Sequence, residues 1–381
     1  MEKKRLLWLV SWYPNENDAF VGDFIQRHAR LAAEHYAITV IHCVTSTQHN
    51  NPKVVRKPLL NGEEVNIYVP KYEKNQVMTA WLWWQAMRQE VNRYLQRGDP
   101  IGIHIHVPWK AGLMAWWLWK RKGIPYIITE HWGIYNGVVS DNFNRWAWLS
   151  KKILKKVVSG SKCFTAPSHF LLNEAIGLFA YTGPKLQLHN VVDTRLFQPA
   201  AYQPKGVFTF LHVSNMVPLK NVAGLLEAFK ILYKKQAHVR LHLAGAEPLW
   251  AKRWIAAEGL NEVVQLTPEV PQPHIAKFMQ QAHCYVQNSV MENAPCVISE
   301  ALCCGLPVVA TAVGGIPEMI DGTNGVLVPP QNIEAFSAGM EHVMQRAKVY
   351  DVVHISSKAA DKYGKDAVLA TFSTLYNTYF C

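Results

Sequence analysis

Short apolar segments alternate with longer amphipathic ones along this chain. The apolar segments, which predict strands, lie at residues 5–11, 38–43, 101–107, 126–129 and 163–166, and helical patterns lie at 22–34, 78–95, 112–122 and 144–158. Such β-α alternation is typical of a parallel sheet covered by helices on both faces, because each parallel connection must cross back over the sheet. The sequence therefore predicts an α/β fold.

The alternation stops once and then restarts. Residues 190–199 form a polar stretch that ends in a proline and is typical of a linker. Strand patterns follow at 208–213, 239–244, 263–266, 284–287, 308–310 and 325–328, with helices expected between them, the first at 222–235. Two successive α/β units of similar size predict two Rossmann-like domains that face each other across a cleft, with ligands beyond the carboxyl ends of the strands.

Composition narrows the classes of partner. The chain has 381 residues and a formal net charge of +11, which favours anionic partners such as nucleotide phosphates or a membrane surface. It contains no zinc-finger, ribonucleoprotein or helix-turn-helix pattern, so nucleic acid is not expected as a partner. The longest apolar run, residues 111–119, is too short to span a bilayer. The seven scattered cysteines, an odd number, indicate reduced thiols, and we expect a cytoplasmic protein.

The segment at 288–307 is chemically the most informative. Pro295 is placed as the first residue of a helix, where its missing N–H costs nothing, and Gly305 is placed to end that helix. The free N–H groups at such a helix start can bind an anion. Glu292 precedes the helix and Glu300 lies inside it, and a carboxylate can accept two hydrogen bonds from neighbouring ribose hydroxyls. The alternative is that Glu300 is a surface helix residue and Glu292 an ordinary loop acid.

Two other segments fit the same kind of ligand. Gly314 and Gly315 follow a buried strand pattern, and glycines let the backbone approach a ligand closely. Lys220 lies in a strand-to-helix turn at 213–221, where its charge could neutralise a diphosphate. Taken singly, an ordinary loop and a solvated lysine are the alternatives.

Together these three segments resemble the GT-B-fold retaining glycosyltransferases known as group 1 or family 4. The family motif is two glutamates with seven residues between them, followed by Gly-x-Pro-Val and Gly-Gly-x-x-Glu. This chain has Glu292 to Glu300, Gly305-Leu-Pro-Val308 and Gly314-Gly315-Ile-Pro-Glu318. The resemblance implies a GT-B fold: an acceptor-binding domain at 1–195, a nucleotide-sugar-binding domain at 196–365, and a C-terminal helix at about 366–381 that packs back on the first domain.

The resemblance also implies roles for single residues. Glu300 would hold the donor ribose, Glu292 would lie near the transferred sugar, and Lys220 would pair with the diphosphate. The remaining donor-site positions at the helix start would be Asn293, Ala294, Pro295 and Cys296. The family usually has arginine where this chain has Asn215, so a second positive charge on the diphosphate is missing or supplied elsewhere.

Two segments of the first domain resemble the family's acceptor side. Residues 11–15 and 20–24 resemble a loop that reaches over the cleft, although Gly22 alone remains of the usual double glycine. A plain strand-to-helix loop is the alternative. His131 follows a strand, where the family often has a histidine close to the reacting sugar. A lone histidine is more often structural, but its place at a strand end favours a site.

His104 and His106 fall on one face of a predicted strand. Two imidazoles so placed would suit a metal, but no third ligand follows at a convincing spacing, and the fold that this chain resembles normally works without metal. We expect both to line the cleft or the core, and we expect no metal and no other cofactor.

The segment 145–158 predicts a basic amphipathic helix. Trp148, Leu149, Ile153 and Val157 can share one face, with lysines beside it. Such a helix can lie on anionic lipid, which would make the protein peripheral on the inner face of a membrane. A core-packed helix with solvated lysines is the alternative.

The implied function is that of a retaining hexosyltransferase. It would move a sugar from a UDP- or GDP-type donor to a glycan, lipid-linked or small-molecule acceptor, in cell-surface polysaccharide synthesis. Retention in the family is explained by attack on the face that the phosphate leaves, with the phosphate taking the acceptor's proton. Two alternatives remain open: a nucleotide-sugar 2-epimerase of the same architecture, and a non-catalytic nucleotide-sugar-binding protein.

Overall fold

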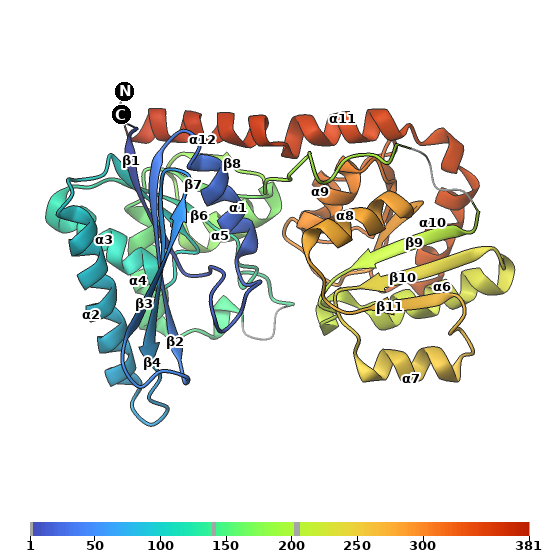
Figure 1. Cartoon of the computed structure of the whole chain (residues 1–381), viewed down its shortest axis with the longest axis horizontal. Coiled ribbons are helices and arrows are strands. Elements are labelled where there is room, and N and C mark those ends of the chain that lie inside the picture. The colour runs from blue at the N-terminus through green and yellow to red at the C-terminus, as the bar shows by residue number, and fades with distance from the viewer. Residues whose placement is uncertain (1–2, 139–141, 202–205, 381) are drawn as a thin grey trace. The chain divides into compact units, whose positions relative to one another are not determined.

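The computed structural model describes residues 3–138, 142–201 and 206–380, and the chain divides into two compact units. Unit 1 comprises residues 1–191 and 368–381, and unit 2 comprises residues 192–367. Each unit is an α/β domain with its own sheet (Figure 1). The α/β prediction is therefore confirmed for both halves of the chain, and the divisions lie close to the predicted limits at 195 and 365.

In the described residues, the sheet of unit 1 has eight strands in the order β3-β4-β2-β1-β5-β6-β7-β8. The strands are β1 (Arg5–Val10), β2 (Ala37–Ser46), β3 (Lys53–Leu59), β4 (Gly62–Pro70), β5 (Gly102–His106), β6 (Tyr126–Thr129), β7 (Phe164–Ala166) and β8 (Lys185–Gln187). The helices are α1 (Asp23–Ala32), α2 (Gln76–Leu95), α3 (Ala111–Lys122), α4 (Trp148–Ser159) and α5 (His169–Phe179), joined by α12 (Lys365–Tyr379). All neighbouring strands run parallel except β3 and β4.

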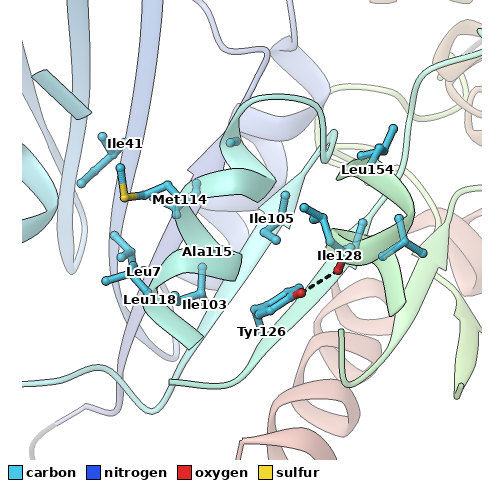
Figure 2. Packing of buried hydrophobic residues seen from close by; sticks show 14 of the residues in the cluster. Leu7, Ile41, Ile103, Ile105, Met114, Ala115, Leu118, Tyr126, Ile128 and Leu154 are labelled. Atoms are coloured by element: carbon cyan, nitrogen blue, oxygen red, sulfur yellow. Dashed lines mark hydrogen bonds between the residues drawn. The ribbon is translucent and has the colours of Figure 1, made fainter. Parts of the chain in front are cut away.

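Both faces of this sheet are buried, which is why its central strand β1 is apolar from Leu6 to Val10. Leu7 and Leu9 of β1 point to the face covered by α2, α3, α4 and α5, while Leu6 and Trp8 point to the face covered by α1 and α12. Figure 2 shows the first of these cores, where the Tyr126 hydroxyl donates a hydrogen bond to the carbonyl oxygen of Val157 at 2.6 Å. The polar end of this tyrosine is thus satisfied inside an apolar layer.

The antiparallel hairpin of β3 and β4 was not predicted. β3 is the edge strand of the sheet, mostly exposed, and it contains three cationic residues and Pro58. Charges and proline are common on edge strands, where one row of backbone groups faces solvent. Such a strand lacks the apolar run by which the other strands were recognised.

The prediction for the basic helix was partly wrong. α4 begins at Trp148, and Arg145 lies in a separate 3₁₀ turn at Phe143–Arg145. Val157 is buried, whereas Trp148 is 70% and Leu149 59% exposed. The core face of α4 is formed by Leu154, Val157 and Val158, so the four apolar residues predicted to share a face are divided between core and solvent.

Unit 2 has a six-stranded parallel sheet in its described part, in the order β11-β10-β9-β12-β13-β14. The strands are β9 (Phe208–Val213), β10 (Val239–Ala244), β11 (Val264–Thr267), β12 (Cys284–Gln287), β13 (Val308–Thr311) and β14 (Gly325–Val328). The helices are α6 (Val222–Lys235), α7 (Leu249–Ala257), α8 (Gln272–Gln281), α9 (Cys296–Cys303), α10 (Ile333–Gln345) and α11 (Val352–Tyr363). Helices α8, α9 and α11 cover one face, and α6, α7 and α10 cover the other.

Two details at the borders of unit 2 differ from expectation. Val192 and Phe197, inside the predicted linker, are buried in the core of unit 2, so this segment is part of the domain. Pro295 is the cap residue before α9, which begins one residue later than predicted. Gly305 has a positive φ of 77° directly after the helix, the backbone conformation that stops it.

The last helix, α12, belongs mostly to unit 1. Its buried residues Val368, Phe372, Leu375 and Tyr376 pack in the same cluster as Trp8 and Ile25. Across the described ranges, no helix is long and apolar enough to cross a bilayer.

Candidate functional site

The sheet of unit 2 reverses its strand order between β9 and β12. The chain moves outward from β9 to β10 and β11, then returns to β12 and moves the other way. At such a switch point the loops at the carboxyl ends diverge and leave room for a ligand. Lys220 follows β9 and Glu292 follows β12, so the topology brings together two predicted site residues that are 72 positions apart.

The Glu292 carboxylate is the centre of a polar cluster. Its Oε1 accepts hydrogen bonds from Lys220 Nζ at 2.6 Å, Gln287 Nε2 at 2.8 Å and Ser289 Oγ at 2.8 Å. Glu292 is 8% exposed, so the ion pair with Lys220 is largely withdrawn from water. Its other oxygen, Oε2, accepts no hydrogen bond from the residues that the structure describes.

The donors to Glu292 are themselves held in place. The Tyr285 hydroxyl donates to Gln287 Oε1 at 2.6 Å, and Thr311 Oγ1 donates to the carbonyl oxygen of Ser289 at 2.6 Å. Burial raises the pKa of Tyr285 well above its ordinary value, and the nearby carboxylates of Glu292 and Glu300 raise it further. The phenol therefore stays protonated and remains a donor. Sequence analysis missed Gln287, Ser289 and Tyr285, which precede the motif on β12 and its loop.

Glu300 is not a surface residue. It is 3% exposed within α9, and it lies close enough to Tyr285 to affect the pKa of that hydroxyl. At the start of α9, Pro295 is the cap residue and provides no side-chain hydrogen bond to the first turn. The other predicted donor-site positions at this start, Asn293, Ala294 and Cys296, are half-buried.

The glycine loop after β13 has a structural role that was not predicted, and its close approach to a ligand stays a prediction. Gly314 has a φ of 56°, and a Cβ added there would lie 1.7 Å from the carbonyl oxygen of Glu292. The N–H of Gly315 donates to that same oxygen at 3.0 Å. The close backbone approach that requires glycine is therefore made to Glu292 itself, and it fixes the position of the acid.

The turn after β9 exposes Asn215, the residue that stands where the family usually has arginine. Before it, His212 contacts the Val286 carbonyl through Nδ1 at 2.9 Å and Ser214 Oγ through Nε2 at 2.7 Å. Burial lowers the pKa of His212 to about 4, so the ring is neutral and stiffens the turn without adding charge. Lys220 is thus the single cation among the described donors to Glu292.

Unit 1 reverses its strand order between β1 and β5. Gly22 follows β1, His106 ends β5, and His131 lies two residues beyond β6. His106 Nδ1 and His131 Nε2 are 3.1 Å apart, and the two rings stack with centroids 5.4 Å apart. The structure thus brings His131 to the switch point of this sheet. It does not bring Gly22 onto open surface, since that residue is buried.

Gly22 is required by the chain itself. Its φ is 68°, and a Cβ there would lie 2.7 Å from the carbonyl carbon of Trp12. It precedes α1 as the cap residue, without a side-chain hydrogen bond to the helix. A contact of this backbone with a donor phosphate stays a prediction.

Glu130, next to His131, was given no role by sequence analysis. It is fully buried, and its carboxylate accepts hydrogen bonds from the backbone N–H groups of His131 and Trp132, both at 2.8 Å, and from the Tyr135 hydroxyl. Burial raises the pKa of Glu130 to about 7, and these hydrogen bonds limit the increase. The acid shapes the loop that presents His131. The sequence signal that could have identified Glu130 was its position directly before the candidate residue His131.

The loop after β5 contains a second feature that the sequence did not reveal. Val107 and Lys110 both have positive φ, 60° and 64°. This conformation is unfavourable for a β-branched residue such as valine, and it concentrates at functional sites. Ser11 Oγ holds the loop by donating to the carbonyl oxygen of Val107 at 2.7 Å.

His104 is a core residue, as one of the two expectations had it. Its Nδ1 contacts the Tyr376 hydroxyl at 2.8 Å and its Nε2 contacts Thr129 Oγ1 at 2.6 Å. Both ring nitrogens are therefore satisfied. His28 of α1 and His131 lie beside His106, and one ring nitrogen of each lies within 4.8 Å of the others, a grouping that the sequence spacing did not reveal. The expectation of no metal stays a prediction.

Comparison with known families agrees with this geometry. The family described as "Glycosyl transferases group 1" matches residues 195–364, and "Glycosyltransferase Family 4" matches residues 21–196. D-inositol 3-phosphate glycosyltransferase of Paenarthrobacter aurescens is 27% identical over 290 residues, which cover 70% of each chain. TuaC of Bacillus subtilis, a glycosyltransferase provisionally assigned to teichuronic acid biosynthesis, is 25% identical over 392 aligned positions, covering 95% of this chain and 96% of that protein.

Solved structures share the fold at low identity. Sucrose-phosphate synthase of Thermosynechococcus elongatus superimposes with a TM-score of 0.78 at 17% identity, over 99% of both chains. HepE of Anabaena in complex with UDP superimposes with a TM-score of 0.75 at 15% identity, over 98% of this chain and 100% of that one. The two units thus form the GT-B pair of Rossmann-like domains, and the chain is an enzyme that belongs to the group 1 glycosyltransferases.

Proposed function

We propose that this enzyme is a retaining hexosyltransferase that uses a nucleotide diphosphate sugar. The observation that carries the proposal is the state of Glu292. Its Oε1 is saturated by three donors including Lys220, while Oε2 accepts nothing from the described residues beside the start of α9. A fixed acceptor oxygen suits a sugar hydroxyl, and a cation with a helix start suits the phosphates next to it.

Glu300 and Lys220 are the proposed contacts to the nucleotide. Glu300 would accept hydrogen bonds from the ribose hydroxyls, with the backbone at Asn293, Ala294, Pro295 and Cys296 around the sugar and phosphates. Lys220, which is only 23% exposed, would stabilise the charge that grows on the leaving diphosphate. Asn215 provides no second charge at the usual place, so Lys220 carries more of this task.

The reaction follows from this arrangement and from the family resemblance. A hydroxyl oxygen of the acceptor forms a bond to the anomeric carbon as the bond from that carbon to the diphosphate oxygen breaks. The acceptor's proton passes to the departing diphosphate, and attack on the same face retains the anomeric configuration. His131 is proposed to contact the sugar during transfer, and burial holds its pKa well below the ordinary value, so it acts as a neutral group.

The relatives support the substrate class. HepE has been solved with UDP and with UDP-glucose, and TuaC is connected by name to teichuronic acid biosynthesis. We propose a UDP- or GDP-type donor, an acceptor that is a glycan, a lipid-linked sugar or a small molecule, and a place in cell-surface polysaccharide synthesis.

Thermal-shift measurements with UDP-, GDP- and ADP-sugars test the donor site. We expect one of these donors to raise the unfolding temperature of the wild type, and Glu300→Ala and Lys220→Ala to weaken that shift. Lys230→Ala is a matched control. Lys230 lies in the same unit, but its ammonium group pairs with the carboxylate of Glu258, at 2.7 Å, and not with Glu292. Equal shifts for all four proteins would overturn the assignment.

Nuclear magnetic resonance tests the chemistry. With donor and acceptor, we expect a new glycoside whose anomeric configuration equals that of the donor. Inversion at C2 of the free nucleotide sugar, without acceptor, would instead identify a 2-epimerase. Donor binding without turnover across a broad acceptor panel would identify a non-catalytic binding protein.

We also propose a cytoplasmic enzyme that attaches peripherally to anionic lipid through α4. Trp148 and Leu149 are exposed on this helix beside Lys151, Lys152, Lys155 and Lys156, and α4 contains no acidic residue. Aromatic and aliphatic side chains enter the lipid interface while lysines contact anionic headgroups. Sedimentation with phosphatidylglycerol vesicles, compared with phosphatidylcholine vesicles, should show binding that Trp148→Ser and Lys152→Glu weaken. Equal sedimentation with both vesicle types would reject the attachment.

A further inference from the structure

We propose that His28, His106 and His131 of unit 1 form a zinc-binding site. Each ring offers one nitrogen, and these three atoms lie within 4.8 Å of one another. The histidines come from three separate elements: α1, the end of β5, and the loop after β6. The fold therefore brings together three ligands of a kind that zinc prefers.

The spacing is close to that of a bound ion. With Zn–N bonds of 2.0–2.1 Å, two ligand nitrogens of a tetrahedral site are separated by about 3.3 Å. His106 Nδ1 and His131 Nε2 are already 3.1 Å apart. Since the widest separation in the cluster is within 4.8 Å, small rotations of the rings complete the approach.

Two buried ring nitrogens of these histidines have no hydrogen-bond partner in the structure: His28 Nδ1, and His106 Nε2, the nitrogen of that ring that does not contact His131. Buried polar atoms are almost always satisfied, so an orphaned nitrogen indicates a partner such as water or an ion. His104, on the same strand as His106, shows the contrast, because both of its nitrogens are bonded. Of the two, His28 Nδ1 is the unsatisfied nitrogen that can act as a ligand together with His106 Nδ1 and His131 Nε2.

The orientation of His28 matches that of a metal ligand. Its Nε2 contacts the carbonyl oxygen of His189 at 3.0 Å and must therefore carry the proton. This leaves the lone pair on Nδ1, the nitrogen without a partner. Histidine ligands of metals commonly donate their other N–H to a carbonyl in this way, which fixes the tautomer.

The cluster is neutral and ready to coordinate. Burial lowers the pKa of His28 to about 4 and holds those of His106 and His131 well below their ordinary value. Each neutral ring has one lone pair, so zinc needs no net loss of protons from these histidines. The nearest acid along the chain, Glu130, uses its carboxylate on the N–H groups of its own loop and on Tyr135. We expect water or hydroxide in the fourth position, since His131 retains 7% exposure.

Zinc at this position would also affect the proposed transferase reaction. His131 is the proposed sugar contact, and coordination would occupy a ring nitrogen and fix the ring. Zinc is therefore expected to inhibit transfer. This last consequence depends on the proposed function, whereas zinc binding does not.

Zinc binding is tested first on the wild-type protein. Equilibrium dialysis against zinc chloride should give one zinc per chain, and X-ray absorption of that complex should show three imidazoles and no sulfur in the first coordination shell. A shell with sulfur or with fewer than two imidazoles, or no retained zinc, would overturn the site. This measurement needs no variant and no activity.

Variants then identify the ligands. His28→Asn and His106→Asn should each weaken zinc affinity at least about 10-fold. His42→Asn is the matched control, because His42 is also buried in unit 1 but its Nδ1 is bonded to Asn66 at 2.8 Å. Retained zinc affinity in folded His28→Asn and His106→Asn would overturn the proposal. Zinc binding without inhibition would leave the site intact and count against the role of His131 in transfer.

Discussion

The polar side chains beyond the central strands differ between the two sheets: they are charged in unit 2 and neutral in unit 1. In unit 2, Glu292 carries a charge that is compensated by Lys220 and two neutral donors. In unit 1, the corresponding position holds uncharged imidazoles, and two of their buried nitrogens lack partners. The same topology therefore holds a compensated charge in unit 2 and neutral rings in unit 1. We propose an anionic donor at the first position and zinc at the second.

The largest expected effect concerns acid stability. Burial lowers the pKa of His28 and His42 in unit 1 to about 4, from an ordinary 6.5. The unfolded chain binds these protons first, so the unfolding free energy of unit 1 falls as the pH falls from about 6.5 to about 4, by up to about 3 kcal/mol for each histidine. His104, His106 and His131 shift in the same direction. Unit 2 contains fewer histidines with a lowered pKa in its described part, His212 and His242, so we expect unit 1 to open before unit 2.

Two measurements separate the units in that acid titration. All tryptophans except Trp250 and Trp254 lie in unit 1, so tryptophan emission reports mainly on that unit. Hydrogen exchange followed by mass spectrometry reads both units separately. Simultaneous unfolding of both units, or earlier hydrogen exchange in unit 2, would contradict the prediction that unit 1 is the less acid-stable unit.

The second prediction concerns the contribution of Glu130 to the stability of unit 1 at different pH values. Its pKa is raised to about 7 in the folded protein from an ordinary 4.5, so it stabilises unit 1 at low pH and this contribution is lost as the pH rises from about 4.5 to about 7. Glutamine keeps the shape and can donate to the Tyr135 oxygen. The advantage of wild type over Glu130→Gln should shrink by up to about 3 kcal/mol between pH 4.5 and pH 8. Denaturant unfolding at both pH values gives this difference, and a constant difference would contradict the assignment.

The third expectation concerns the ion pair of unit 2. Lys220→Ala should lower kcat/KM about 100-fold, because Lys220 is the one cation among the described residues that pairs with Glu292 and is the proposed stabiliser of the leaving diphosphate. Lys220→Arg should recover part of the loss. Lys230→Ala, whose lysine pairs elsewhere, should change little. Steady-state kinetics with the donor found by thermal shift provides the test, and equal rates for Lys220→Ala and Lys230→Ala would refute it.

The smallest expected effect concerns the glycine that positions Glu292. Gly314→Ala should lower the unfolding free energy of unit 2 by more than about 1 kcal/mol, because the added Cβ would meet the Glu292 carbonyl oxygen at a positive φ. Gly322→Ala, where a Cβ meets nothing within 4 Å, is the matched control in the same unit. Equal unfolding free energies of Gly314→Ala and Gly322→Ala in urea would contradict the prediction, because the loop at Gly314 would then accommodate the added Cβ without loss of stability.

Much of the fold could be predicted because both units obey regular patterns. Buried parallel strands are mostly apolar, so β1, β9 and β13 were visible as apolar runs. The edge strand β3 was not visible, because exposure allows it charges and a proline. The apolar residues of α4 gave a misleading face, since the helical spacing alone does not say which side meets the core.

The candidate site likewise has features that the sequence predicted and contacts that only the structure revealed. The spacing of Glu292 and Glu300 and the position of Lys220 are sequence properties, and they sufficed to predict the family. The donor contacts assigned to these residues stay a prediction. The pairing of Lys220 with Glu292, and the part played by Gln287 and Ser289, were not visible in the sequence. These contacts depend on strand order, which places β9 next to β12.

The amino-acid sequence by itself determined the α/β class, the two-unit organisation and the residues of the donor motif, because periodicity and local spacing are written along the chain. The tertiary structure alone decided which of these residues meet. It directed Gly314 to the Glu292 backbone, buried Glu130 beneath the His131 loop, and joined His28 of α1 to two histidines about 80 and 100 positions away. Such contacts arise because a parallel sheet gathers the ends of distant strands at one edge, and no local pattern records that edge.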